Sequence, residues 1–76
     1  MKQLIEFMVG QFIDEPASFE ITEETNNSRT IYYVAVHEKD RGKIIGRKGR
    51  IIKAIRTVVN AAASKKNRRA AVELLE

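Results

Sequence analysis

Two glycines separated by two cations interrupt a helical pattern in the second half of the chain. The segment GKIIGRKGRIIKAIR, residues 42–56, has amphipathic spacing except at Gly46, Arg47, Lys48 and Gly49. Because each glycine inside a helix costs about 1 kcal/mol relative to alanine, an ordinary surface helix would be a poor place for both. The spacing therefore predicts a functional turn between a short helix and a longer one.

A turn of this kind is suited to binding a phosphate group. The first N–H groups of the following helix have no acceptor inside that helix, and we expect them to point outward, where the helix dipole also favours an anion. Gly46 and Gly49 have no Cβ atoms, so a sugar-phosphate backbone can approach closely, while Arg47 and Lys48 neutralise its charge. The turn thus predicts a contact between the protein backbone and the sugar-phosphate backbone of a nucleic acid.

The residues on either side of the turn extend the candidate site. Ile44 and Ile45 come just before it and would support a shallow apolar groove for the bases of a single strand. Lys43, Arg50 and Lys53 add three cations within about one helical turn of the glycines. We expect these five residues and the glycine turn to bind single-stranded RNA, although single-stranded DNA presents the same features to such a site.

Charge is distributed unevenly along the chain of 76 residues. Residues 1–38 contain two basic and seven acidic residues, a net charge of −5, whereas residues 39–76 contain twelve basic and three acidic residues, a net charge of +9. This asymmetry indicates that the second half meets a polyanion, although a solvated surface would account for part of it. Nucleic acid is the commonest polyanion for a protein to bind.

Composition narrows the class of protein further. The chain is short enough for one domain, residues 1–76, and has no cysteine and a single histidine, His37. One histidine cannot form a metal site by itself or supply both a base and its orienting group, and the glycine turn lacks the Gly-Lys-Ser/Thr ending of a P-loop. We therefore expect no enzyme activity, no metal and no cofactor.

The N-terminal segment and the hydropathy of the chain bear on its location. MKQLIEF mixes glutamine and glutamate into its apolar residues, unlike a signal peptide, and no apolar run approaches the length that spans a bilayer. The absence of cysteine fits a reducing compartment. We expect a soluble cytoplasmic protein with no membrane partner.

The first half of the chain predicts a helix followed by a hairpin. Apolar residues at four-residue spacing indicate a helix over Lys2–Ile13, which Asp14-Glu15-Pro16 ends. Residues 19–22 alternate in polarity, the run TIYYVAV (30–36) is rich in β-branched and aromatic residues, and Asn26-Asn27-Ser28 between them favours a turn. A two-stranded hairpin is the expected structure.

The second half predicts two helices and a tail that fits either helix or strand. Asp40 is the expected N-cap of a short helix that runs to about Ile45, and a longer helix begins near Arg50. The tail AAVELLE, residues 70–76, suits a helix by propensity and a strand by alternation, and we favour a strand because a hairpin alone is marginal.

The longer helix separates apolar from polar residues around its axis. Six apolar side chains fall within an arc of about 120°: Ile51, Ile52, Ile55, Val58, Val59 and Ala62. Arg50, Lys53, Arg56 and Asn60 fall on the opposite side. We expect the first set to face the core, while the basic stripe fits a solvated face as well as it fits a binding surface.

These residues resemble a known family. The run IGRKGRI, residues 45–51, between a short and a long helix resembles the I-G-x-x-G-x-x-I signature of the KH domain. The predicted order of elements resembles the type II KH arrangement of bacterial proteins. Residues 42–63 and the chain length are similar to the small single-KH RNA-binding proteins of the KhpA (YlqC) family.

The resemblance implies a fold and settles the tail. It implies an α+β type II KH domain with the order α-β-β-α-α-β, in which residues 70–76 join a three-stranded mixed sheet with the helices packed on one face. Tyr32, Val34 and Val36 would then face the helices and Tyr33 the open face. His37 is interpreted as an exposed loop residue outside the groove, in a position where relatives have small residues.

The resemblance also implies a function and partners. A protein of this family would be a single-stranded RNA-binding protein, acting as an RNA chaperone or post-transcriptional regulator linked to cell growth, division and shape. It would pair with itself or with a second KH-containing protein, and the broad apolar surface of a small domain independently favours a homodimer. The alternative is a protein-interaction subunit whose KH fold mainly mediates dimerisation, but the intact GxxG with two cations favours RNA binding.

Overall fold

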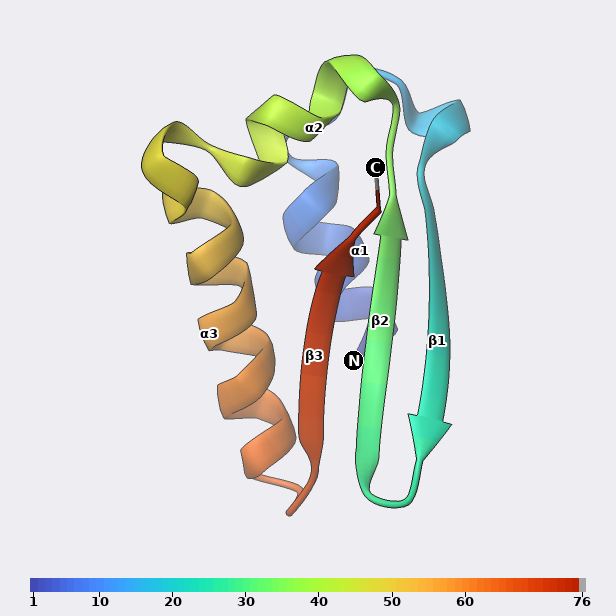
Figure 1. Cartoon of the computed structure of the whole chain (residues 1–76), viewed down its shortest axis with the longest axis vertical. Coiled ribbons are helices and arrows are strands. Elements are labelled where there is room, and N and C mark those ends of the chain that lie inside the picture. Colours follow the sequence, from blue (N-terminus) through green and yellow to red (C-terminus); the bar gives the residue numbers. More distant parts are fainter. Residues whose placement is uncertain (76) are drawn as a thin grey trace.

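The computed structural model describes residues 1–75, and Figure 1 shows how the elements are arranged. The helices and strands are α1 (Lys2–Gly10), β1 (Glu20–Asn26), β2 (Arg29–Ala35), α2 (Glu38–Ile45), α3 (Arg50–Ser64) and β3 (Arg69–Leu74), with single 3-10 turns at Pro16–Ser18 and Arg47–Gly49. This order and the α+β class are those predicted from the sequence.

The sheet is mixed, with the strand order β1-β2-β3. β1 and β2 are antiparallel, and Asn27 in their two-residue connection has a φ of 58°, a left-handed conformation that asparagine tolerates. β3 is parallel to β2 because α2 and α3 carry the chain from the end of β2 back to the end of the sheet where β2 begins (Figure 1). The predicted third strand is therefore confirmed, although it covers Arg69–Leu74, and Glu76 lies outside the described residues.

One core joins the helices to a single face of the sheet. Tyr32 and Val34 of β2 are buried, as predicted, and Val36 packs against them at the edge of the core. Tyr33 alternates with them onto the other face and is only half-buried. The buried set draws on every element: Ile5, Val9, Ile21, Tyr32, Val34, Ile44, Ile52, Ile55, Val59 and Val72.

The first helix is shorter than its apolar pattern suggested. α1 ends at Gly10 rather than at Ile13, and the N–H groups of Gln11 and Phe12 bond to carbonyls three residues back, at 3.3 and 3.0 Å. Glycine is a poor helix former, and the tighter bonding ends the helix there. The periodicity continued past the end because Ile13 still packs against the core from outside the helix.

The start of the second helix corrects two predictions. His37 is the N-cap, where its Nδ1 atom accepts a hydrogen bond from the Lys39 N–H at 3.1 Å, so it is a half-buried cap rather than an exposed loop residue. Asp40, the predicted cap, lies inside α2 and is fully buried. The carboxylate of Asp40 instead accepts hydrogen bonds from the N–H groups of Asp14 and Glu15, both at 3.0 Å, and so ties the segment after α1 to α2.

The third helix buries a narrower face than predicted. Ile52, Ile55 and Val59 are in the core, but the fourth buried residue is Ala63 rather than Ala62. Val58 is 44% exposed, and the half-buried Ile51, at the edge of the core, lines the same surface hollow as Val58. The apolar arc is wider than the sheet covers, which leaves an apolar surface between α1 and α3.

Residues 1–75 contain neither a helix that could span a membrane nor a group of side chains that could hold a metal ion. No helix there is both long and apolar enough to cross a membrane. Over the same residues, no three His, Asp or Glu side chains are grouped so that they could hold a metal ion.

Candidate nucleic-acid interface

The glycine turn has an unusual backbone. Gly46 ends α2 with a φ of 76°, Gly49 precedes α3 with a φ of 71°, and Lys48 between them has a φ of 58°. Glycine adopts this region freely, whereas a residue with a Cβ pays roughly 1–2 kcal/mol. The left-handed Lys48 is therefore held by its neighbours in a conformation that it would not choose alone, which is typical of functional turns.

The two glycines are required for different reasons. A Cβ atom at Gly46 would lie 2.6 Å from Cγ1 of Ile51, so this position has no room for any other residue. A Cβ atom at Gly49 would meet nothing within 4 Å. Gly46 thus lets α2 and α3 pack closely, whereas Gly49 faces open space that a ligand backbone can enter.

The hydrogen bonds of the turn correct part of the predicted anion site. The Gly49 N–H donates to the Gly46 carbonyl at 3.1 Å, and the Arg50 N–H donates to the Arg47 carbonyl. The sequence predicted unpaired N–H groups at the start of the longer helix, but these two N–H groups already have acceptors within the turn. An anion at this turn would instead be attracted by the cations of the turn and by the N-terminal end of the α3 dipole.

Four of the predicted cations lie on the glycine turn and the first turn of α3. Arg47, Lys48, Arg50 and Lys53 are all exposed. Within residues 1–75, no carboxylate lies within 4.0 Å of their charged groups, because the ion pairs of that part of the chain involve only Lys43. As far as residues 1–75 are concerned, these four positive charges are not neutralised by an ion pair.

Lys43 differs from the other predicted site cations. Its ammonium forms an ion pair with Asp14 and lies 3.6 Å from Oδ1 of Asp40. The hydrogen bond to Asp14, together with the two nearby carboxylates, raises the pKa of Lys43. RNA would therefore have to compete with Asp14 for this side chain.

Asp40 is the buried partner in this cluster. Burial alone would raise the pKa of Asp40, but the N–H donors of Asp14 and Glu15 and the charge of Lys43 outweigh it, so the pKa is lowered. The carboxylate therefore stays ionised inside the protein. It fixes α2, and with it the start of the glycine turn, against the segment that follows α1.

The two isoleucines before the turn have separate places. Ile44 is fully buried, so it has no surface that a base could contact. Ile45 is half-buried and packs at the edge of the core. Of the two, only Ile45 has surface for an apolar contact with a ligand.

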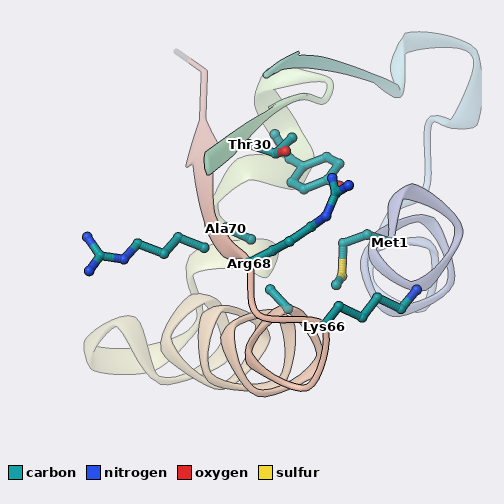
Figure 2. Close-up of a pocket in the computed structure, with 8 residues that line it drawn as sticks. Met1, Thr30, Lys66, Arg68 and Ala70 are labelled. Carbon is teal, nitrogen blue, oxygen red and sulfur yellow. The ribbon is translucent and has the colours of Figure 1, made fainter. Parts of the chain in front are cut away.

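A cavity of about 290 Å³ lies at the far end of α3 from the glycine turn (Figure 2). Figure 2 shows Arg68 extending toward Thr30, with Lys66 on the side of Met1. Tyr32 forms part of the wall, and burial together with the charge of Glu23 raises its pKa, which Arg68 partly offsets. The sequence prediction assigned no role to these cations, although the run KKNRR (65–69) was their visible signal.

An apolar groove of about 340 Å³ runs between α1 and α3. Phe7, which is 68% exposed, and Val58 stand at its surface, and Arg50 lies at the end of the groove nearest the glycine turn. We call this surface the α1–α3 groove. Its lining is Phe7, Met8, Gln11, Phe12, Arg50, Ile51, Ala54, Ile55 and Val58.

Comparison with known proteins agrees with this geometry. A family described as KhpA/KhpB, KH domain matches residues 2–74. The RNA-binding protein KhpA of Clostridium acetobutylicum is 44% identical over 75 residues, which cover 99% of this chain and all of the relative. Proteins of the same name from Oceanobacillus iheyensis and Borreliella burgdorferi are 41% and 42% identical, over 99% and 97% of this chain and 100% and 90% of the relatives.

These matches span the helices, the sheet and the glycine turn alike, so they concern the whole fold rather than a short motif. The resemblance read from residues 45–51 is confirmed. This chain belongs to the KhpA/KhpB family of KH domains.

Proposed function

We propose that this chain is a single-stranded RNA-binding protein whose GxxG turn holds the RNA backbone. The observation that carries the proposal is the open space at Gly49, in a turn whose neighbouring residues along the chain are exposed cations that lack carboxylate partners within residues 1–75. The name of its relatives, RNA-binding protein KhpA, supports the same conclusion.

In the proposed complex, a phosphate lies against Gly49 at the start of α3. Arg47, Lys48 and Arg50 surround it, and the positive end of the α3 dipole adds to their attraction. The adjoining bases lie along the surface at Ile45, and Lys53 meets the next phosphate one helical turn further on. Most of this contact is with the backbone, so the turn itself gives affinity more than sequence preference.

The small size of the site suggests how the protein acts. A four-nucleotide clamp that binds mainly the backbone holds many RNAs transiently, which suits an RNA chaperone or post-transcriptional regulator rather than an enzyme. No group of the turn is arranged to cleave or form a bond. We place this activity in the bacterial cytoplasm, where transcripts and their translation are found.

We also propose that the protein forms a homodimer through the α1–α3 groove. The exposed Phe7 and Val58 stand on the same face as the hollow between the two helices. In a twofold dimer a projecting side chain and a hollow on one face complement each other, so that each copy supplies both. A second KH-containing protein with a similar groove would fit the same surface, which is the alternative function as a protein-interaction subunit.

Charge reversal in the turn tests RNA binding. Replacing Arg47 and Lys48 together by Asp places two negative charges where the phosphate binds and leaves both glycines and the core unchanged. The loss of one or two phosphate contacts, with added repulsion, should weaken binding by at least about 2 kcal/mol and make its salt dependence shallower. The measurement is the affinity for single-stranded RNA at two salt concentrations.

The matched control is Lys53→Ala, which removes one charge further from the turn and should weaken binding less. Circular dichroism checks that each variant is folded. If the doubly substituted protein were folded and bound RNA as tightly as the parent, the turn would not be the phosphate site, and the protein-interaction function would be favoured.

A further inference from the structure

The turn between α3 and β3 carries a second group of cations. Lys65, Lys66, Arg68 and Arg69 are all exposed, and we call the segment Lys65–Arg69 the basic turn. In the part of the chain that the structure describes, none of them has a carboxylate within 4.0 Å. Like charges gathered without counter-charges repel one another, and a bound polyanion would relieve that repulsion.

The basic turn is extended by a cation from the neighbouring strand. Arg29 at the start of β2 is paired in register with Arg69 at the start of β3, and the Arg69 N–H donates to the Ser28 carbonyl at 3.0 Å. Like charges on directly adjacent strands destabilise a sheet. An anion between the two guanidinium groups would turn this repulsion into attraction.

The backbone of the basic turn is defined rather than loose. Asn67 has a φ of 56°, its N–H donates to the Ser64 carbonyl, and the Arg68 N–H donates to the Ala63 carbonyl, both at 3.0 Å. This pair of bonds is the Schellman arrangement that ends many helices. The arginines are therefore presented from a fixed position at the end of α3.

A polar track leads from the glycine turn to the basic turn. Arg50, Lys53, Arg56, Asn60 and Ser64 follow one another at three- and four-residue spacing along one side of α3. Arg56 links this exposed side to β3, since its Nε donates to the Val72 carbonyl at 3.1 Å. α3 has 15 residues, so the track is about 22 Å long.

The track ends in a hollow of about 440 Å³ between the end of α3 and the start of β3. Its lining is Arg29, Asn60, Ser64, Arg68, Arg69, Ala70 and Ala71. Arg68 and Arg69 also line the cavity of Figure 2, on the other side of the same turn. Arg68 and Arg69 thus line two hollows, one on each side of the basic turn.

We propose that the basic turn and Arg29 form a second phosphate-binding site for the RNA strand that the GxxG turn holds. The strand runs from the glycine turn along the polar side of α3 and reaches the hollow beside Arg69. The footprint of the protein is therefore longer than the four nucleotides that a GxxG loop clamps. This inference rests on the proposed RNA-binding function and extends it to the length of the substrate.

Oligonucleotides of two lengths separate the two sites. We would measure the affinity of single-stranded oligouridine of about 5 and about 12 nucleotides by fluorescence anisotropy at two salt concentrations. The test variant carries Arg68→Ala and Arg69→Ala, whose backbone hydrogen bonds remain. The matched control carries Gln3→Glu and Thr22→Glu, which change the net charge equally at exposed positions of α1 and β1.

The basic-turn variant should bind the long oligonucleotide about tenfold more weakly than the parent, with a salt slope smaller by about 1, and the short one within about twofold. The control should stay within about twofold on both lengths. Equal weakening of the two lengths, or no weakening of the long one beyond the control, would overturn the second site.

The charge reversal at Arg47 and Lys48 shows which proposal has failed. If it abolishes binding of both lengths while the basic-turn variant changes neither, RNA binding by the GxxG turn stands and the second site is wrong. If the parent protein binds neither oligonucleotide, the RNA-binding function is wrong and the second site falls with it.

Discussion

At the scale of single residues, Gly46 and Gly49 are not interchangeable. Alanine at Gly46 combines a left-handed φ with a clash against Ile51 and should lower the free energy of unfolding by about 2–4 kcal/mol. Alanine at Gly49 has only the conformational cost, about 1 kcal/mol. Urea denaturation of both variants measures the difference, and equal losses would contradict the separate roles given to the two glycines.

Asp40 makes stability depend on pH. Because its pKa in the folded protein lies below its usual value of 3.8, the ionised carboxylate stabilises the fold at neutral pH, and that contribution is lost as pH falls through the folded pKa. Asp40→Asn should therefore unfold at a lower urea concentration than the parent at pH 7, and the difference should shrink below about pH 4.

Asp14→Asn is the matched control for Asp40. It removes a carboxylate from the same cluster, but the side chain of Asp14 is 75% exposed, so its loss should change the urea midpoint far less at pH 7. A parent and an Asp40→Asn variant whose midpoints differed by the same amount at pH 3 and pH 7 would show that the carboxylate charge is not what stabilises α2.

Residue types alone could not reveal these roles. Asp40 was a reasonable N-cap by type, yet it is a buried acceptor because Asp14 and Glu15, which lie 26 and 25 residues before it, donate their N–H groups to its carboxylate. His37 is a weak capping residue by type, and its Nδ1 atom caps α2 because the chain leaves β2 only two residues earlier. Both depend on contacts that spacing along the chain does not show.

At the scale of elements, local sequence patterns predicted which helices and strands form, whereas tertiary packing determines how much of each one is buried. The glycine turn, the hairpin and α3 follow from residue types at short spacing, and all are present. The boundary of the core on α3 does not follow from residue types, because the width of the buried face depends on where α1 and the sheet lie. Val58 fits the apolar arc as well as Val59 does, but only Val59 is covered.

The uncovered residues of α1 and α3 lead to a prediction about assembly. If the α1–α3 groove is the dimer interface, Val58→Asp places a charge inside it and should convert the protein from a dimer to a monomer. Light scattering at micromolar concentration should give twice 8.7 kDa for the parent and a mass near 8.7 kDa for the variant.

Thr57→Asp adds the same charge to the neighbouring exposed position of α3, away from the groove, and should leave the dimer intact. A parent mass near 8.7 kDa up to millimolar concentration would contradict dimerisation. Dissociation by both variants alike would instead point to a general effect of charge on α3.

At the scale of the whole molecule, the fold places nine of the twelve basic residues of the second half along α3 and its two ends. The glycine turn lies at the start of α3 and the basic turn at its end, as Figure 1 shows, so a charge asymmetry visible in the sequence becomes a polar side of the molecule. The sequence indicated a polyanion as the partner. The path proposed for the RNA strand could not be predicted from the sequence, because it depends on the packing of β3 against α3.

The central claim, that the GxxG turn holds the RNA backbone, is tested most directly by mapping the contact in solution. Single-stranded RNA would be titrated into isotope-labelled protein while the backbone amide resonances are followed by NMR. The largest shifts should occur at Gly46–Gly49 and in the first turn of α3. Shifts confined to the α1–α3 groove or the open face of the sheet, with the turn unchanged, would contradict the claim.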